Sequence, residues 1–221
     1  LRVKEKTAPT ITITSPSAGA YITNTTPTIE FQVKDTDSGV NAGTIAVTVD
    51  GTAVSTVTKT AIDGGYKCTC TSPTLKDGSH TISVKASDND GNAAAAKTAT
   101  FTVDTVPPTL QIMAPSNGPI TNKKTVTVSG KTDDVSSKPV TVTVNGATVT
   151  VGTDGTFTKD VTLAGGANTI TIVAKDKAGK TTTVTRKVTV DTSAPVIKSV
   201  TLTPNPVDCG KTFIIAVEIT D

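Results

Sequence analysis

The stretch LKDGSHTISVKASD at residues 75–88 and the stretch LAGGANTITIVAKD at residues 163–176 follow one pattern. In both, a leucine precedes a glycine-bearing turn, and a run follows in which apolar residues such as Ile82 and Val84 alternate with polar ones. This alternation places the apolar side chains on one face of a β-strand. A sheet with one apolar face must pack against a second sheet, so the repeated stretch predicts a β-sandwich that occurs twice.

A second repeated signal marks the start of each unit. Residues 5–11, 104–110 and 191–197 share an acidic residue, three further residues, a proline, one residue and an aliphatic residue. Their prolines lie about 99 and about 87 residues apart, which is the size of one small β-sandwich. We therefore predict one domain at residues 7–104, another at residues 105–191, and the first two strands of a third at residues 192–221.

Each complete unit is expected to contain about seven strands, because turn signals interrupt the alternating runs every 8–12 residues. Asp50-Gly51 and Asn145-Gly146 are the clearest of these signals, since type I′ hairpin turns need positive φ angles. The expected strands of the first unit centre on Ile11, Ile29, Ile45, Val54 with Val57, Cys68, Ile82 and Phe101. The second unit repeats this plan, and helical periodicity is absent from both.

The aligned pattern of residues 75–92 and 163–180 is L-x-x-G-x-[HN]-T-I-x-[VI]-x-A-x-D-x-x-G-[NK]. It resembles the bacterial Ig-like domains that occur in tandem in surface proteins, adhesins and secreted glycosidases. Asn145-Gly146 and the following DGTF at residues 154–157 strengthen the resemblance, which covers residues 7–191. The resemblance implies an all-β chain of tandem immunoglobulin-like sandwiches. It implies no single function, because these domains serve many roles.

Composition argues against several classes of protein. Aromatic residues make up only 3% of the chain and Trp is absent, so the cores must be small and aliphatic, without a deep ligand cavity. The net charge is +2 and basic residues are scattered, which argues against nucleic acid as a partner. No apolar run approaches the roughly 20 residues needed to span a bilayer. Because the chain begins at Leu1, we interpret it as a fragment or a mature product.

The cysteines and the single histidine are expected to be structural. Cys68 and Cys70 share one face of a strand with their Cα atoms about 6.5–7 Å apart, at or past the limit for a disulfide, and Cys209 has no partner. His80 aligns with Asn168, so we expect a side chain that hydrogen-bonds the preceding turn. No phosphate-binding loop or catalytic pair stands out, and we predict that the chain is not an enzyme.

Acidic loops provide the one candidate site. Asp35 and Asp37 fall in one loop of the first unit and Asp88 and Asp90 in another, and in an Ig-like sandwich these loops share one end. Their oxygens suit Ca²⁺, which takes six to eight such ligands. In the second unit Lys177 occupies the matching loop and is expected to repel a cation. Calcium is the only candidate cofactor, and a calcium site is expected in the first unit rather than the second. The alternative is that these acidic residues only form turns.

The acids that end the units pose a related question. Asp104 and Asp191 each precede a short junction that contains proline. Either residue can cap the junction through backbone N–H groups, which we favour, or share a cation with the next domain. Because the junctions are short and proline restricts them, neighbouring units are expected to adopt a limited range of angles.

These patterns favour a non-catalytic extracellular array that acts as a stalk, spacer or adhesion module of a larger bacterial surface or secreted protein. The alternatives are a phage or prophage tail or baseplate appendage on the virion, which would bind the host surface, and an accessory domain of a secreted glycoside hydrolase. Expected partners are neighbouring domains and a cell-surface polysaccharide or protein receptor. The apolar strand that begins at Phe213 and ends near Ile219 is expected to be covered by the second unit or by another chain.

Overall fold

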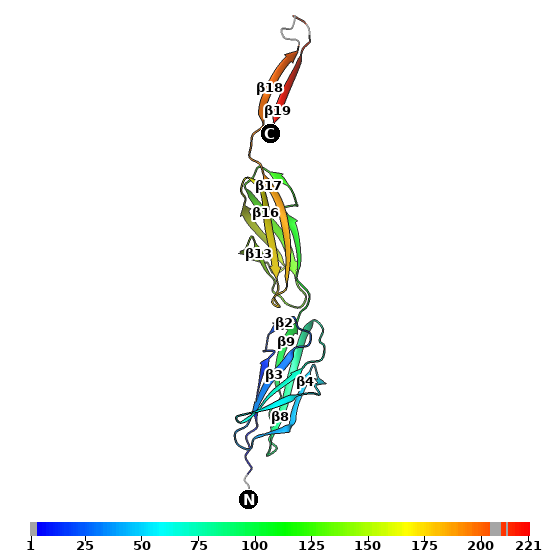
Figure 1. The fold of residues 1–221 in the computed structure, drawn as a ribbon, viewed down its shortest axis with the longest axis vertical. Coiled ribbons are helices and arrows are strands. Elements are labelled where there is room, and N and C mark those ends of the chain that lie inside the picture. Colours follow the sequence, from blue (N-terminus) through cyan, green and yellow to red (C-terminus); the bar gives the residue numbers. More distant parts are fainter. Residues whose placement is uncertain (1–3, 204–208, 211) are drawn as a thin grey trace.

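The computed structural model describes residues 4–203, 209–210 and 212–221. These residues form two β-sandwiches and a two-stranded hairpin, which follow one another along the long axis of the molecule (Figure 1). The predicted all-β fold of tandem sandwiches is confirmed. Within the described ranges, no helix has the length and apolar character that crossing a membrane requires.

The first sandwich consists of a four-stranded sheet in the order β1-β3-β7-β6 and a five-stranded sheet in the order β2-β9-β8-β4-β5. Neighbouring strands are antiparallel except for β2, which pairs in parallel with the end of β9. The bounds are β1 (Thr10–Ser15), β2 (Tyr21–Ile22), β3 (Thr28–Lys34), β4 (Val40–Val49), β5 (Thr52–Ala53), β6 (Thr58–Ile62), β7 (Gly65–Thr71), β8 (Gly78–Asp88) and β9 (Lys97–Val103).

The second sandwich repeats this plan with sheets in the orders β10-β12-β15 and β11-β17-β16-β13-β14. The short β11 again pairs in parallel with the last long strand, β17. The bounds are β10 (Thr109–Ala114), β11 (Ile120–Thr121), β12 (Thr125–Asp133), β13 (Thr141–Val144), β14 (Ala147–Val149), β15 (Thr156–Thr162), β16 (Gly166–Lys175) and β17 (Thr181–Val190).

Each sandwich has its own core, which is mainly aliphatic and also buries Phe31 and Phe101 in the first unit and Phe157 in the second. The alternation of residues 75–88 and 163–176 is realised in β8 and β16, where Ile82, Val84, Ile170 and Ile172 are fully buried. The buried side chains form two separate clusters, one per sandwich. Because burial of apolar surface is the main favourable term in folding, two separate cores imply two units that fold nearly independently.

The predicted strand through Val54 and Val57 is wrong. The chain forms β5 and β6 instead, and the two valines lie between them, half-buried against the core. Since β5 pairs with β4 in one sheet and β6 with β7 in the other, this segment crosses between the layers. The strands β2 and β11 were not predicted, because two-residue strands are too short to show alternation.

The turn signals are confirmed. Asp50 and Gly51 have φ angles of 50° and 80°, and Asn145 and Gly146 have φ angles of 47° and 81°. Positive φ at both central residues is what a type I′ turn requires, and each pair joins two strands, β4 to β5 and β13 to β14.

The C-terminal hairpin consists of β18 (Val196–Thr203) and β19 (Ile214–Thr220), paired antiparallel. All residues of both strands are exposed, and the hairpin projects beyond the second sandwich (Figure 1). Of the two covers that the sequence left open, the second unit is therefore excluded, and coverage by another chain stays a prediction. The junction after Asp191 directs the hairpin away from the sheets of the second unit instead of folding it back over them.

We predict that Ile82→Asp unfolds only the first sandwich and Ile170→Asp only the second. Both side chains are fully buried, and an unpaired buried carboxylate costs several kcal/mol. Calorimetry of the wild type should resolve two contributions to unfolding, of which each variant loses one. Ile120→Asp is the control, since Ile120 is 75% exposed and should tolerate the charge. Loss of both contributions in either core variant would contradict independent folding.

Candidate functional site

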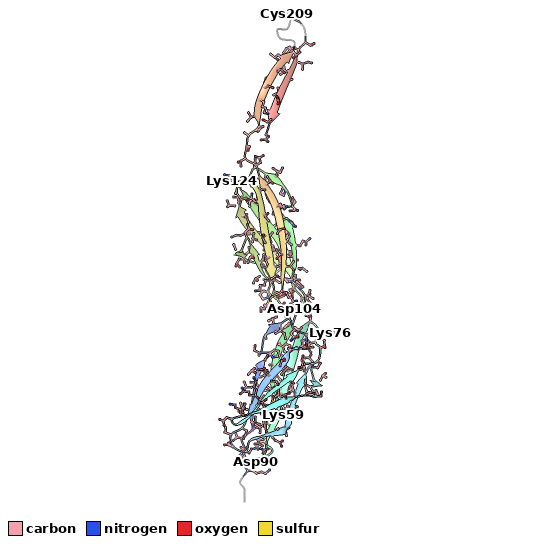
Figure 2. The ribbon with its side chains drawn as sticks, viewed as in Figure 1. Lys59, Lys76, Asp90, Asp104, Lys124 and Cys209 are labelled. Atoms are coloured by element: carbon pink, nitrogen blue, oxygen red, sulfur yellow. The ribbon has the colours of Figure 1, made fainter. Side chains whose placement is uncertain are left out.

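Three carboxylates meet where the two sandwiches join. Asp104 directly follows β9 of the first unit, and Figure 2 shows it at the boundary between the units. Asp134 follows β12 and Asp176 follows β16, so both belong to loops of the second unit. One carboxylate oxygen from each residue lies within 4.8 Å of the others. The group is therefore built from both units.

Backbone contacts fix the position of Asp104. Its N–H donates to the carbonyl oxygen of Ile22 over 2.9 Å, which extends the parallel pairing of β2 and β9 by one bond. Its Oδ1 accepts from the Val106 N–H at 3.1 Å, and its Oδ2 accepts from the hydroxyl of Ser137. Asp104 thus ends one unit, caps the junction as we expected from the sequence, and contacts a loop of the next unit.

The other two carboxylates are held by their own loops. Asp134 Oδ1 accepts from the N–H groups of Ser136 at 2.8 Å and Ser137 at 2.7 Å. Asp176 Oδ1 accepts from the Lys180 N–H at 2.8 Å. Such turns bring short acidic side chains back over the backbone, which explains why aspartate suits these positions.

The junction carboxylates are buried without a countercharge. Asp104, Asp134 and Asp176 are 1%, 6% and 5% exposed. In the described part of the chain, ion pairs form only between Lys67 and Glu30, His80 and Asp50, and Lys138 and Asp133. Oδ2 of Asp176 is a buried side-chain oxygen without a hydrogen-bond partner among these residues.

Lys177 forms no ion pair with the acidic group among the described residues, and the expectation that it repels a cation there stays a prediction. Its Nζ lies 5.0 Å from the centre of the Tyr21 ring, in the first unit. Attraction between an ammonium and an aromatic face contributes about 0.5–1 kcal/mol at an exposed site. Lys177 therefore contacts the neighbouring unit instead of neutralising the carboxylates.

The first unit carries an equivalent group at its far end, near the labelled Asp90 in Figure 2. One carboxylate oxygen each of Glu5, Asp35 and Asp88 lies within 4.8 Å of the other two. Of the four predicted calcium ligands, Asp35 and Asp88 are thus brought together, whereas Asp37 and Asp90 lie outside the group. Asp90 instead accepts a hydrogen bond from the Glu5 N–H at 3.2 Å.

Asn92 makes the difference between the two groups. Its amide Nδ2 donates to Asp88 Oδ2 at 2.6 Å and to Glu5 Oε1 at 3.0 Å, within the first group. Burial by itself raises the pKa of Asp88, but hydrogen bonds with Glu5 and Asn92 outweigh it and hold that pKa well below its usual range. Lys180 occupies the equivalent position in the second unit and offers Asp176 only its backbone N–H.

Asp191 occupies the same position in the repeated sequence as Asp104, but the two residues differ in burial. Its N–H donates to the carbonyl oxygen of Thr121, and its Oδ1 accepts from the Ser193 N–H at 2.9 Å. Unlike Asp104, Asp191 is exposed. Each of these acids is thus positioned by the strand that ends its own unit, but in the described part of the chain only Asp104 contacts a loop of a following sandwich. Glu5 was not predicted as a site residue, although its place in the repeated start signal makes it the counterpart of Asp104.

His80 is a structural residue, as predicted. Its Nδ1 lies 2.7 Å from Asp50 Oδ2 and its Nε2 lies 2.7 Å from the carbonyl oxygen of Lys76, in the preceding turn. Asn168 makes the equivalent contact, donating to the carbonyl oxygen of Ala164 at 2.8 Å. With both ring nitrogens engaged, His80 does not act as a general base toward a nucleophile in this arrangement.

The buried cysteines are unreactive thiols. Cys68 and Cys70 are free and lie on the core face of β7, as predicted, whereas Cys209 is exposed. Burial raises the pKa of Cys68, and burial together with the neighbouring Cys68 raises the pKa of Cys70 to about 11. Because the thiolate is the nucleophile and the metal ligand, neither residue forms a reactive site at neutral pH.

Comparison with protein families matches each sandwich separately. Residues 9–84 match the family described as bacterial Ig domain, and residues 108–192 match glucodextranase, domain B. Bacillopeptidase F of Bacillus subtilis (strain 168) is 31% identical over 185 residues, which are 84% of this chain. The aligned part is only 12% of that relative's length.

Solved structures agree on the fold. The fibronectin(III)-like modules of Clostridium thermocellum CbhA superpose with a TM-score of 0.50 at 19% identity, covering 82% of this chain and 94% of theirs. Titin domains I67-I69 superpose with a TM-score of 0.51 at 12% identity, covering 87% of this chain and 68% of theirs. At such identities the likeness concerns the sandwich architecture alone.

We predict that the His80–Asp50 pair makes the stability of the first unit depend on pH. Burial by itself lowers the pKa of His80, but hydrogen bonds to Asp50 and Lys76 and the charge of Asp50 outweigh it and raise that pKa. The contribution of the His80–Asp50 pair to the stability of the first unit is therefore full below the unfolded pKa of His80, about 6.5, and is lost as the pH rises through the folded pKa. It should not exceed about 1 kcal/mol, because the pair is partly exposed.

Thermal unfolding between pH 5 and pH 9 measures this effect. His80→Asn, which installs the residue that the second unit uses, should remove the fall in stability of the first unit above pH 6.5. The second unit, with Asn168, provides an internal control that should not respond. An unchanged pH profile in the variant would rule out the pair as its cause.

Proposed function

Because its two complete sandwiches belong to the bacterial Ig-like domain family, we propose that this chain is a non-catalytic extracellular spacer in a larger bacterial protein. The observation that carries the proposal is the end-to-end junction (Figure 1), which holds in line two sandwiches that each have a separate hydrophobic core. A spacer needs length and a defined direction, and this arrangement supplies both. Threonine, roughly a fifth of the residues, provides a polar, uncharged exterior suited to this role.

Contacts on both sides of the linking segment support a defined direction. Thr105 donates from its N–H and its hydroxyl to Asp77, a residue of the first unit, over 2.9–3.0 Å. On the other side, the Thr182 hydroxyl donates to the carbonyl oxygen of Pro108 at 2.5 Å. Proline fixes φ within the segment, so few backbone angles are left to vary. Such a short, bonded junction restricts bending between the units.

The absence of catalytic features favours a supporting role over a chemical one. Among the described residues, His80 faces Asp50 and a turn carbonyl, and burial raises the pKa of the Cys68 and Cys70 thiols. The relative Bacillopeptidase F is a peptidase by name, and this chain aligns with 12% of it. We infer that the aligned part corresponds to an accessory region there, as in modular proteins in which binding or catalytic domains need spacing.

We further propose that residues 196–221 open a third sandwich. β18 and β19 pair antiparallel in the same way as β1 with β3 and β10 with β12. All three pairs have a register shift in the first strand, between Ile13 and Ser15, between Ile112 and Ala114, and between Ile197 and Ser199. An isolated two-stranded hairpin is marginal in water, so this segment requires further strands for stability.

We predict that the chain is extended in solution. Small-angle scattering should give a maximum dimension close to the summed lengths of the two sandwiches and the projecting hairpin, because the linking residues are bonded to both units. A carbohydrate array probed with the same protein separates a spacer from an adhesion module, since a spacer should bind none of the glycans. A compact scattering profile, or reproducible glycan binding, would contradict the spacer role.

We predict that truncation after residue 195 reduces self-association. The exposed hairpin carries Ile214, Ile215, Val217 and Ile219 with exposures of 47–69%, and an uncovered apolar strand pair invites pairing with another chain. Analytical ultracentrifugation should show association of the full chain that residues 1–195 lack, while both sandwiches melt unchanged. If residues 196–221 exchange their amide hydrogens freely in a monomeric full chain, the hairpin is a tail and not the start of a sandwich.

A further inference from the structure

We propose that Asp104, Asp134 and Asp176 form a Ca²⁺ site that joins the two sandwiches. Asp104 comes from the end of the first unit, and Asp134 and Asp176 come from two loops of the second. Binding of the ion therefore connects the units directly. This site differs from the one that the sequence predicted at the far end of the first unit.

The geometry fits a single ion. The three oxygens lie within 4.8 Å of one another, and Ca²⁺ binds oxygen at about 2.3–2.6 Å. Two ligands on opposite sides of one ion are thus about 4.6–5.2 Å apart, so one ion can contact all three carboxylates. Separations of at most 4.8 Å are compatible with one shared ion, since ligands that are not opposite one another lie closer together.

Charge and burial favour a cation. Three carboxylates that are at least 94% buried concentrate negative charge in a region where no described residue forms an ion pair with them. Isolated buried charges are costly, and proteins compensate for them by pairing, protonation or metal coordination. A divalent cation neutralises most of this charge in one step.

The unpartnered oxygen of Asp176 gives independent support for a ligand. Asp176 is 95% buried, since it is only 5% exposed, and its Oδ2 has no hydrogen-bond partner in the described part of the chain. Buried polar atoms are nearly always satisfied, so an unsatisfied one calls for a partner such as a bound ion. In the first unit the Asn92 amide satisfies the equivalent oxygen of Asp88 at 2.6 Å. The second unit leaves this oxygen free to bind a metal ion.

The donor set selects calcium among common cations. All three ligands are carboxylates and the neighbouring Ser137 adds a hydroxyl, whereas Zn²⁺ and Cu²⁺ favour histidine and cysteine. Mg²⁺ is usually bound by one or two carboxylates in strict octahedral geometry, whereas Ca²⁺ accepts more carboxylates, mono- or bidentate, in flexible geometry. A cleft of about 380 Å³ at the junction is lined by Asp77, Asp104 and Asp134 among others, and so borders two of the three carboxylates.

The consequence is calcium-dependent stiffness of the junction. With the ion bound, bending between the units would require breaking a metal–ligand bond in addition to the hydrogen bonds of Thr105 and Thr182. Binding of the ion does not depend on the proposed spacer role, whereas the biological purpose of a stiffer junction does. Binding and shape are therefore measured separately, so that one can fail without the other.

Isothermal titration with CaCl₂ of the full chain tests the site. The wild type should bind Ca²⁺, and Asp176→Asn should weaken that binding at least as much as losing an outer-shell partner does, about 10- to 100-fold. Asp104→Asn should have the same effect from the other unit, and it changes no residue of the second core. Asp160→Asn is the matched control, since it removes one negative charge from an exposed strand position.

Two further measurements distinguish ion binding at the junction from binding at the first unit and from unfolding. Glu5→Gln, which alters the carboxylate group of the first unit, should leave the junction binding unchanged. Thermal melting without calcium should show that Asp176→Asn and Asp104→Asn are folded. Adding CaCl₂ should raise the melting temperature of the second unit in the wild type but not in these two variants. The proposal is overturned if the wild type binds no Ca²⁺ at millimolar concentration, if the two junction variants bind as the wild type does, or if MgCl₂ binds equally well.

Discussion

The packing of two sheets through mainly aliphatic side chains, with a few buried phenylalanines, is the constraint on which the rest of this molecule depends. Valine, isoleucine and alanine on alternate positions of β8 and β16 leave a thin core between the layers. Such a core admits few large or polar groups, so chemistry is confined to the ends of the sandwich. There the loops are free to carry aspartate and serine, and the end of one unit meets the beginning of the next.

The polar junction follows from this arrangement. The pairing of β2 with β9 and of β11 with β17 carries the chain straight out of each sandwich, and Asp104 and Asp191 occupy the first position beyond it. At the boundary between the two sandwiches, two loops of the second unit meet Asp104 with the carboxylates of Asp134 and Asp176. Asp104 is buried there, whereas Asp191, beyond which the described residues form only a hairpin, is exposed.

The residues that stabilise each sandwich are different from the residues that connect the two sandwiches. Each core stabilises its own unit, whereas the relation between units depends on a few polar contacts, including Lys177 over Tyr21 and Thr105 with Asp77. Changes at the junction can therefore alter direction and stiffness without unfolding either sandwich. In a spacer this separation allows the shape of the array to respond to conditions, such as the concentration of a cation, while its domains remain folded.

The sequence by itself determined the all-β class, the repeat, the type I′ turns, the inward rows of β8 and β16, and the structural role of His80. These features are local, because alternation and turn chemistry act over a few residues. Only the tertiary structure decided that Val54 and Val57 cross between sheets, that the hairpin is uncovered, and which acids meet. Asp104, Asp134 and Asp176 lie far apart in sequence, and the orientation of Lys177 toward Tyr21 depends on the neighbouring unit. Such contacts are set by how two folded bodies meet, which no local pattern encodes.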